Sequence, residues 1–274
     1  MWTKNGANTL APVLRRIGEV IPTDCVNKRL IIDDKSTDKT RQIAGSFGWQ
    51  VIPNEGNGIS DGANTALQHV ETDYFASFEQ DLFLSRDWWH KIPLYFSDPK
   101  VAIASGIRFD YYPAAVKKIQ EYTAEKYKVE DRPGRFFPYV KTLDNTIYRT
   151  RAIRRIGGFP KLPMSVGVDH ALSQRIHQSA MLWKVDYKIH SIHLRQGLRE
   201  EFEHNYWYGR HSNELQLTLF RKNAEVRSLM IRVLLSPLRG MDIALRKNTP
   251  QAIYIYPLIR LHFLRGVLDS RRVT

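Results

Sequence analysis

The sequence predicts an α/β fold in which a mostly parallel central sheet is flanked by helices and followed by amphipathic C-terminal helices. Two observations predict it. Short apolar stretches typical of buried strands alternate with helical patterns, and basic residues collect among apolar ones over 219–274. The chain has 274 residues, of which 43% are hydrophobic, so it can bury a sizeable core. We therefore predict a domain at 1–218 and a basic amphipathic helical tail at 219–274.

The first third of the chain alternates regularly between the two patterns. Strands are expected at 29–32, 49–52 and 74–78, and helices at 10–20, 39–47 and 63–70. Residues 54–62 contain three glycines and are expected to form a loop. Because consecutive parallel strands need a crossover, which is usually a helix, the alternation favours a parallel sheet covered on both faces.

The rest of the domain adds elements of both kinds. Further strands are expected at 101–107, 146–149 and 182–190, and further helices at 87–96, 114–128, 152–156, 168–178 and 202–219. The remainder of 108–138 mixes polar and aromatic residues without a period, so we expect it to be irregular.

The tail has its own charge and pattern. Residues 219–274 hold 11 basic and 3 acidic residues, and arginines interrupt two apolar clusters at 229–238 and 252–268. Arginines among leucine, isoleucine and aromatic residues favour interfacial helices on an anionic membrane surface. The alternative is a helical hairpin packed on the main domain, with its basic face in solvent. A net charge of +13 also fits a nucleic-acid binder, but no recognisable module supports this, so we predict no nucleic-acid partner.

The sequence also bears on location. Cys25 is the only cysteine, which excludes a disulfide within the chain and fits a reducing compartment. Residues 1–9 are polar, so no signal peptide is visible, and no apolar run reaches the roughly 18 residues of a spanning helix. We predict a cytoplasmic protein that is peripheral on the inner face of the cell membrane.

Carboxylates follow two of the expected strands. Asp33 and Asp34 end one strand, and Glu79 and Asp81 follow another. Each pair alone is more often a turn or a helix cap, but the carboxyl ends of parallel strands open on the same edge of a sheet. Oxygen ligands suit Mg²⁺ or Mn²⁺. No phosphate-binding glycine loop of a known spacing is present, so a bound diphosphate would be neutralised mainly by a metal.

Three later residues are further candidates. His190 and His193 lie at or just past the end of an expected strand, where a histidine is more often structural than a metal ligand. Asp169 begins the helix expected at 168–178 and suits either a helix cap or a general base.

Four motifs now make the chain resemble family 2 glycosyltransferases of the GT-A fold, over residues 2–215. The motifs are Trp2-Thr3-Lys4-Asn5, the segment Ile31-Ile32-Asp33-Asp34-Lys35-Ser36-Thr37-Asp38-Lys39-Thr40, Glu79-Gln80-Asp81, and Ile156-Gly157-Gly158-Phe159 with Gly167-Val168-Asp169. The second is the most specific, and the third stands where the family has D-x-D.

The resemblance implies an inverting glycosyltransferase that moves a sugar from a nucleotide-diphosphate sugar to an acceptor hydroxyl or lipid phosphate. It implies that Asp169 is the catalytic base and that Asp81 and His193 hold Mn²⁺ or Mg²⁺. The implied nucleotide-sugar-binding residues are Thr3, Asn5, Asp33, Asp34, Ser36, Glu79 and Asp81. The acceptor is not specified, and the basic tail makes a lipid-linked one a candidate.

The chain departs from the family pattern at several positions. Glu79 replaces an aspartate, Val168 replaces the glutamate of G-E-D, Gly6 replaces a frequent acid, and the first strand before Thr3 is expected to be truncated. These departures keep an alternative open: a catalytically degraded relative that binds a sugar nucleotide or glycan at a membrane.

Overall fold

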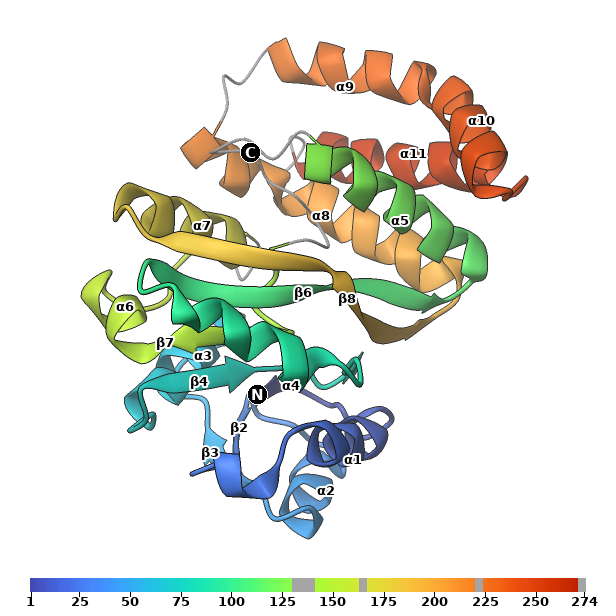
Figure 1. Cartoon of the computed structure of the whole chain (residues 1–274). Helices are drawn as coiled ribbons and strands as arrows, with labels where there is room; N and C mark the ends of the chain where they lie inside the picture. Colours follow the sequence, from blue (N-terminus) through green and yellow to red (C-terminus); the bar gives the residue numbers. More distant parts are fainter. Residues whose placement is uncertain (130–140, 163–166, 220–223, 271–274) are drawn as a thin grey trace. The chain divides into compact units, whose positions relative to one another are not determined.

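The computed structural model describes residues 1–129, 141–162, 167–219 and 224–270 (Figure 1). The chain forms two compact units. The first comprises Met1–Phe109 and Glu130–Leu194, and the second comprises Asp110–Val129 and Arg195–Thr274. The boundary at 218 between a domain and a tail stays a prediction.

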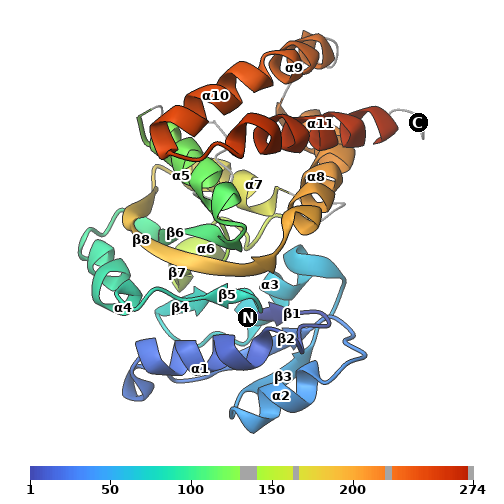
Figure 2. The same cartoon turned by 90° about the vertical axis from the view of Figure 1, so that its right-hand side faces the viewer.

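A three-stranded parallel sheet opens the first unit. β1 (Trp2–Thr3), β2 (Leu30–Asp33) and β3 (Gln50–Pro53) lie in that order, and the helices α1 (Leu10–Val20), α2 (Thr40–Ser46) and α3 (Gly58–Gln68) connect or follow them (Figure 2). The register pairs Thr3 with Asp33 and Asp33 with Pro53. The three strands therefore end side by side, as the sequence predicts for this part of the chain.

A second sheet has five strands. Their order is β4 (Tyr74–Ser77), β7 (Thr146–Arg149), β6 (Val101–Tyr112), β8 (Leu182–Gln196) and β5 (Leu82–Phe83). The pairs β4–β7, β6–β7 and β5–β8 are antiparallel, a direction that the sequence did not predict. A single parallel bridge between Trp2 and Glu79 links the two sheets. This bridge brings the acidic segment that follows β4 to the end of β1.

Three predicted boundaries were wrong. α3 begins at Gly58, inside the expected loop, because the Asp61 carboxylate accepts a hydrogen bond from the Asn57 amide (3.0 Å) and starts the helix there. β6 runs on to Tyr112 and β8 to Gln196, beyond the predicted ends at 107 and 190. The added residues mix polar and apolar side chains, and the sheet includes them although their pattern did not predict a strand.

The other predicted elements have counterparts close to their expected positions. α4 (Trp88–Lys91) continues as a 3₁₀ helix at Ile92–Ser97, which contains Pro93. The remaining helices are α5 (Ala114–Val129), α6 (Thr150–Arg155), α7 (Val168–Gln178), α8 (Leu198–Leu219), α9 (Ala224–Leu234), α10 (Ser236–Lys247) and α11 (Ala252–Ser270). No helix among the described residues is long and apolar enough to cross a membrane.

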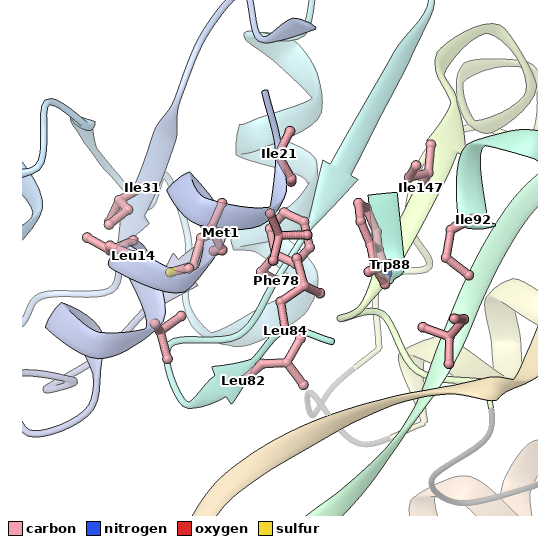
Figure 3. Close-up of a cluster of buried hydrophobic side chains, with 14 of the residues drawn as sticks. Met1, Leu14, Ile21, Ile31, Phe78, Leu82, Leu84, Trp88, Ile92 and Ile147 are labelled. Carbon is pink, nitrogen blue, oxygen red and sulfur yellow. The ribbon is translucent and has the colours of Figure 1, made fainter. Parts of the chain in front are cut away.

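The core of the first unit holds the acidic segment in place (Figure 3). The apolar stripe of α1 packs with Phe78, Leu82 and Trp88, all of which are buried. Phe78 and Trp88 meet edge to face at 5.2 Å, and Trp88 Nε1 donates a hydrogen bond to Asn145 O (3.1 Å). Because Phe78 and Leu82 flank residues 79–81, the core anchors this segment at both ends.

An apolar pocket of about 560 Å³ lies in the first unit. Met1, Leu30, Tyr74 and Phe75 contribute to its wall. The carboxylates that follow β2 and β4 do not line this pocket.

The second unit depends on a close crossing of α8 and α11 (Figure 2). A Cβ at Gly209 would lie 2.0 Å from Phe263 O, and one at Gly266 would lie 2.1 Å from Tyr206 O. Both neighbouring atoms belong to the backbone, so they cannot move aside as a flexible side chain can. The two glycines allow the helix backbones to touch.

Replacing Gly209 by alanine should therefore destabilise the protein. Overpacking of this kind costs roughly 1–3 kcal/mol, so we expect a lower midpoint of thermal unfolding. Gly45→Ala is the matched control, because a Cβ at this helical position has no atom within 4 Å and alanine favours a helix. Equal unfolding midpoints for the two variants would contradict the close crossing.

Candidate active site

The ends of β1 and β2 are fastened together by hydrogen bonds. The amide of Asn5 donates to Ser36 Oγ (2.9 Å), and the amide of Thr37 donates to Asn5 Oδ1 (2.9 Å). The amide of Ser36 in turn donates to Asp33 Oδ2 (3.1 Å). The structure thus brings together Thr3, Asn5, Asp33 and Ser36, which the sequence predicted to act together.

Asp34 lies where this edge meets the loop after β3. Lys4 Nζ is 3.3 Å from Asp34 Oδ2, and the Gly58 amide donates to the same oxygen (3.2 Å). Among the described residues, Thr3 Oγ1 and Asp33 Oδ1 are buried without a hydrogen-bond partner. Since an unsatisfied buried polar atom costs free energy, these two atoms indicate a place where a polar ligand would add stability.

The acidic segment is held against the same edge. The Lys4 amide donates to Gln80 Oε1 (2.9 Å), and Gln80 Nε2 donates to Lys4 O (3.1 Å). A Cβ at position 6 would lie 2.5 Å from Gln80 Oε1. A side chain in place of Gly6, one of the departures from the family pattern, would therefore have to displace the hydrogen-bonded side chain of Gln80.

Glu79, Asp81 and His193 converge on one point. His193 Nε2 is 3.0 Å from Asp81 Oδ2 and 3.4 Å from Glu79 Oε2, and one ligand atom from each residue lies within 4.8 Å of the others. The pairing of β5 with β8 sets Leu82 opposite His193, and the Leu194 amide donates to Asp81 O (2.8 Å). Two carboxylates and an imidazole form a donor set that fits Mn²⁺ or Mg²⁺.

His190 lies away from this cluster. Its ring contacts Phe109 edge to face, its Nε2 is 2.8 Å from Tyr187 O, and it is exposed. Residues 190 and 193 are an odd number of positions apart on β8, so they face opposite sides of the strand. Of the two histidines that the sequence singled out, the structure brings only His193 to the carboxylates.

Arg108 and Asp144 complete the cluster, and neither was predicted from the sequence. Arg108 Nη1 is 3.1 Å from His193 Nε2 and 3.5 Å from Glu79 Oε2, and Arg108 Nε is 3.4 Å from Asp144 Oδ2. Burial raises the pKa of Asp144 to about 6 although Arg108 opposes the shift. Burial would also raise the pKa of Glu79, but Arg108 and His193 outweigh it and lower that pKa below its usual value.

Asp169 lies in the first turn of α7, as predicted. Its Oδ1 accepts a hydrogen bond from the His170 amide (2.8 Å). Burial raises the pKa of Asp169 to about 6, with the His170 hydrogen bond and the charge of Arg108 opposing the shift and Asp144 and Glu79 adding to it. These charges place Asp169 within electrostatic reach of the metal-binding candidates. A carboxylate with this pKa can gain or lose a proton near neutral pH.

The first part of the chain matches a known family. The family described as glycosyl transferase family 2 matches residues 1–157, which is more than half of the chain. The chain belongs to this family. It is a glycosyltransferase, and the first three motifs named above lie in or directly after β1, β2 and β4. A comparison with curated proteins found no match.

Solved structures support the fold of this glycosyltransferase. The mannosyltransferase PcManGT from Pyrobaculum calidifontis, in complex with GDP-Man and Mn²⁺, aligns with a TM-score of 0.67 at 15% identity over 98% of this chain and 85% of its own. S. aureus TarS 1–349 in complex with UDP-GlcNAc aligns with a TM-score of 0.56 at 12% identity over 100% and 90%.

A third solved structure covers less of the chain. Glucosyl-3-phosphoglycerate synthase from Mycobacterium tuberculosis, in complex with Mn²⁺, UDP-Glc and glycerol 3-phosphate, aligns with a TM-score of 0.53 at 15% identity over 73% and 72%. At these identities the likenesses concern the fold. They confirm the predicted GT-A class, with helices following the sheet toward the C-terminus.

Proposed function

We propose that this glycosyltransferase moves a sugar from a nucleotide-diphosphate sugar to an acceptor, with inversion, by metal-assisted direct displacement. The observation that carries the proposal is the convergence of Glu79, Asp81 and His193 next to the fastened ends of β1 and β2. A site for a hard cation thus adjoins buried polar atoms that lack partners. Two fold neighbours were solved in complex with a nucleotide sugar and Mn²⁺, which agrees with this arrangement.

The residues take distinct parts in the proposed reaction. Thr3, Asn5, Asp33, Asp34 and Ser36 hold the nucleotide and fix its orientation. Glu79, Asp81 and His193 would hold Mn²⁺ or Mg²⁺, which when bound supplies positive charge for the departing diphosphate.

Asp169 is the proposed general base. It takes the proton of an acceptor hydroxyl as that oxygen bonds to the anomeric carbon and the bond to the diphosphate oxygen breaks. The proton stays on Asp169, and the electron pair of the broken bond leaves with the nucleoside diphosphate. A lipid phosphate acceptor, which is already ionised, would need no such base.

A thermal-shift screen tests the nucleotide and metal part of the proposal. Because a ligand that binds only the folded state raises its stability, a nucleoside diphosphate with Mn²⁺ should raise the unfolding midpoint more than either does alone. The screen compares UDP, GDP, CDP and ADP with their sugar conjugates, each with Mn²⁺ and with EDTA. No midpoint shift with any nucleotide in Mn²⁺ would count against a sugar-nucleotide site.

A membrane surface is proposed as the second partner, through α9 and α10. Met230, Ile231 and Leu234 lie on one face of α9, and Leu238, Met241 and Leu245 on one face of α10, all exposed. Leu234 is 76% and Leu245 83% exposed. Exposed leucines beside an excess of arginine suit an anionic lipid surface. They support a lipid-linked acceptor and a peripheral position on the inner face of the cell membrane.

Vesicle flotation tests this surface. The full chain should float with vesicles of phosphatidylglycerol and phosphatidylcholine, and much less with phosphatidylcholine alone. Replacing Leu234, Leu238 and Leu245 together by aspartate should abolish flotation, because charges cannot enter the lipid interface without cost. Leu94→Asp is the control, since Leu94 is 67% exposed but lies in the first unit. A wild-type chain that does not float with the anionic vesicles would overturn the membrane proposal.

A further inference from the structure

Arg108 occupies an unusual place, because its guanidinium contacts two of the three candidate metal ligands. Arg108 Nη1 is 3.1 Å from His193 Nε2 and 3.5 Å from Glu79 Oε2. The side chain is only 12% exposed and arises from β6, in the middle of a sheet. The Arg108 guanidinium is therefore a mostly buried cation held within the site and not an exposed surface charge.

The contact with His193 has a chemical consequence. Arginine nitrogens only donate hydrogen bonds, so in the tautomer with its proton on Nδ1 His193 Nε2 accepts from Arg108 with its lone pair; in the other tautomer Nε2 donates to Asp81 Oδ2, 3.0 Å away. A neutral imidazole has one such lone pair, and a metal ion needs the same one. Arg108 and a divalent cation therefore cannot both use His193 Nε2. Glu79 Oε2 can contact Arg108 and a metal ion at the same time, because a carboxylate oxygen has more than one lone pair.

The other end of the guanidinium has a separate anchor. Asp144 is fully buried and lies 3.4 Å from Arg108 Nε, on the edge of the guanidinium next to the aliphatic stem. Rotation about the Cδ–Nε bond can turn Nη1 away from His193 while Nε stays near Asp144. A guanidinium is also well suited to phosphate oxygens, which it binds with two parallel hydrogen bonds.

We propose that Arg108 is a placeholder cation: it holds His193 and Glu79 until a divalent metal ion takes them, and its released end then binds the diphosphate of the sugar nucleotide. Asp144 is the positioning residue that keeps Arg108 at the site during this exchange. The inference rests on the proposed metal and nucleotide sites. It adds that metal binding and diphosphate binding are coupled through one arginine.

The most specific test of the proposal replaces Arg108 and Asp144 in one double variant. Arg108→Gln alone would leave a buried carboxylate without its counter-charge, which is strongly destabilising, and would also attract the metal simply by removing a positive charge. Arg108→Gln with Asp144→Asn leaves the net charge unchanged. Any gain in metal affinity in this double variant then reports the loss of competition for His193. Arg155→Gln, at an exposed position at the end of α6, controls for loss of an arginine elsewhere.

The measurement is Mn²⁺ binding by electron paramagnetic resonance, first without nucleotide and then with UDP or GDP added. Without nucleotide, the double variant should bind Mn²⁺ about tenfold more tightly than wild type, because no placeholder has to be displaced. At saturating Mn²⁺ it should bind the nucleoside diphosphate about tenfold more weakly, since a charge-assisted hydrogen bond is lost. The Arg155→Gln control should match wild type in both.

Unchanged or weaker Mn²⁺ binding in the double variant would overturn the placeholder role. Tighter Mn²⁺ binding with unchanged diphosphate affinity would overturn the transfer of Arg108 to the diphosphate. A wild-type protein that binds no Mn²⁺ would overturn the proposed metal site itself, which is a distinguishable failure. If the double variant does not fold, Arg108→Lys is used in its place. A single ammonium cannot bridge Asp144 and His193, so Arg108→Lys should also bind Mn²⁺ more tightly than wild type. Unchanged or weaker Mn²⁺ binding by Arg108→Lys would overturn the proposal.

Discussion

Replacing Asp169 by asparagine is expected to lower sugar transfer by at least about 100-fold while leaving sugar-nucleotide binding nearly unchanged. The amide has the shape of the carboxylate but cannot take the proton of the acceptor hydroxyl. Transfer is measured as initial rate, and binding by calorimetry with Mn²⁺ present. Asp87→Asn is the matched control, because Asp87 is exposed and its side chain makes no cap hydrogen bond.

The pH dependence of the wild-type rate gives an independent readout of the same residue. Burial raises the pKa of Asp169 to about 6, so below this pH the carboxyl is protonated and cannot act as a base. The rate should therefore rise as the pH increases through about 6 and level off above it. The residual rate of Asp169→Asn should lack this rise. A wild-type rate that is flat between pH 5 and 7, or an Asp169→Asn variant of normal activity, would exclude Asp169 as the base.

Replacing Asp81 by asparagine should have the second large effect, a loss of Mn²⁺ affinity of at least about 100-fold. Outer residues of a metal site already contribute 10–100-fold, and Asp81 is a candidate direct ligand that lies 3.0 Å from His193 Nε2. Mn²⁺ binding is measured by electron paramagnetic resonance of the free ion.

Asp87→Asn again serves as the control, since it makes the same chemical change on the same unit. The Mn²⁺-dependent part of the thermal shift with nucleotide should disappear with Asp81→Asn and persist with Asp87→Asn. Equal Mn²⁺ affinity in the two variants would show that Asp81 is not a ligand.

The parts of the fold that the sequence predicted are those with a strong local signal. α1 has apolar residues at helical spacing and forms over Leu10–Val20 as expected. The carboxylates Asp33 and Glu79 were placed by the ends of apolar strands, and the structure brings these strand ends together through the Trp2–Glu79 bridge. Local patterns sufficed here because each residue's position followed from its own strand.

The parts that the sequence did not reveal depend on partners far along the chain. Arg108 follows an apolar run and looked like the start of an irregular segment, yet it continues β6 because Asp144, Glu79 and His193 surround its charge. No pattern near Arg108 in the sequence indicates those partners. The end of β8 was misplaced for the same reason, and with the strand continuing to Gln196, alternation alone would have separated His190 from His193.

The central claim is that Glu79, Asp81, His193 and Asp169 form one metal-dependent transferase site. The most direct test is the release of nucleoside diphosphate from the sugar nucleotide selected by the thermal-shift screen, measured with Mn²⁺ and with EDTA for wild type, Asp81→Asn and Asp169→Asn. We predict release with Mn²⁺ that stops in EDTA and falls sharply in both variants. A wild type that binds the sugar nucleotide with Mn²⁺ but releases no diphosphate, with or without acceptors, would contradict the claim and favour a binding module.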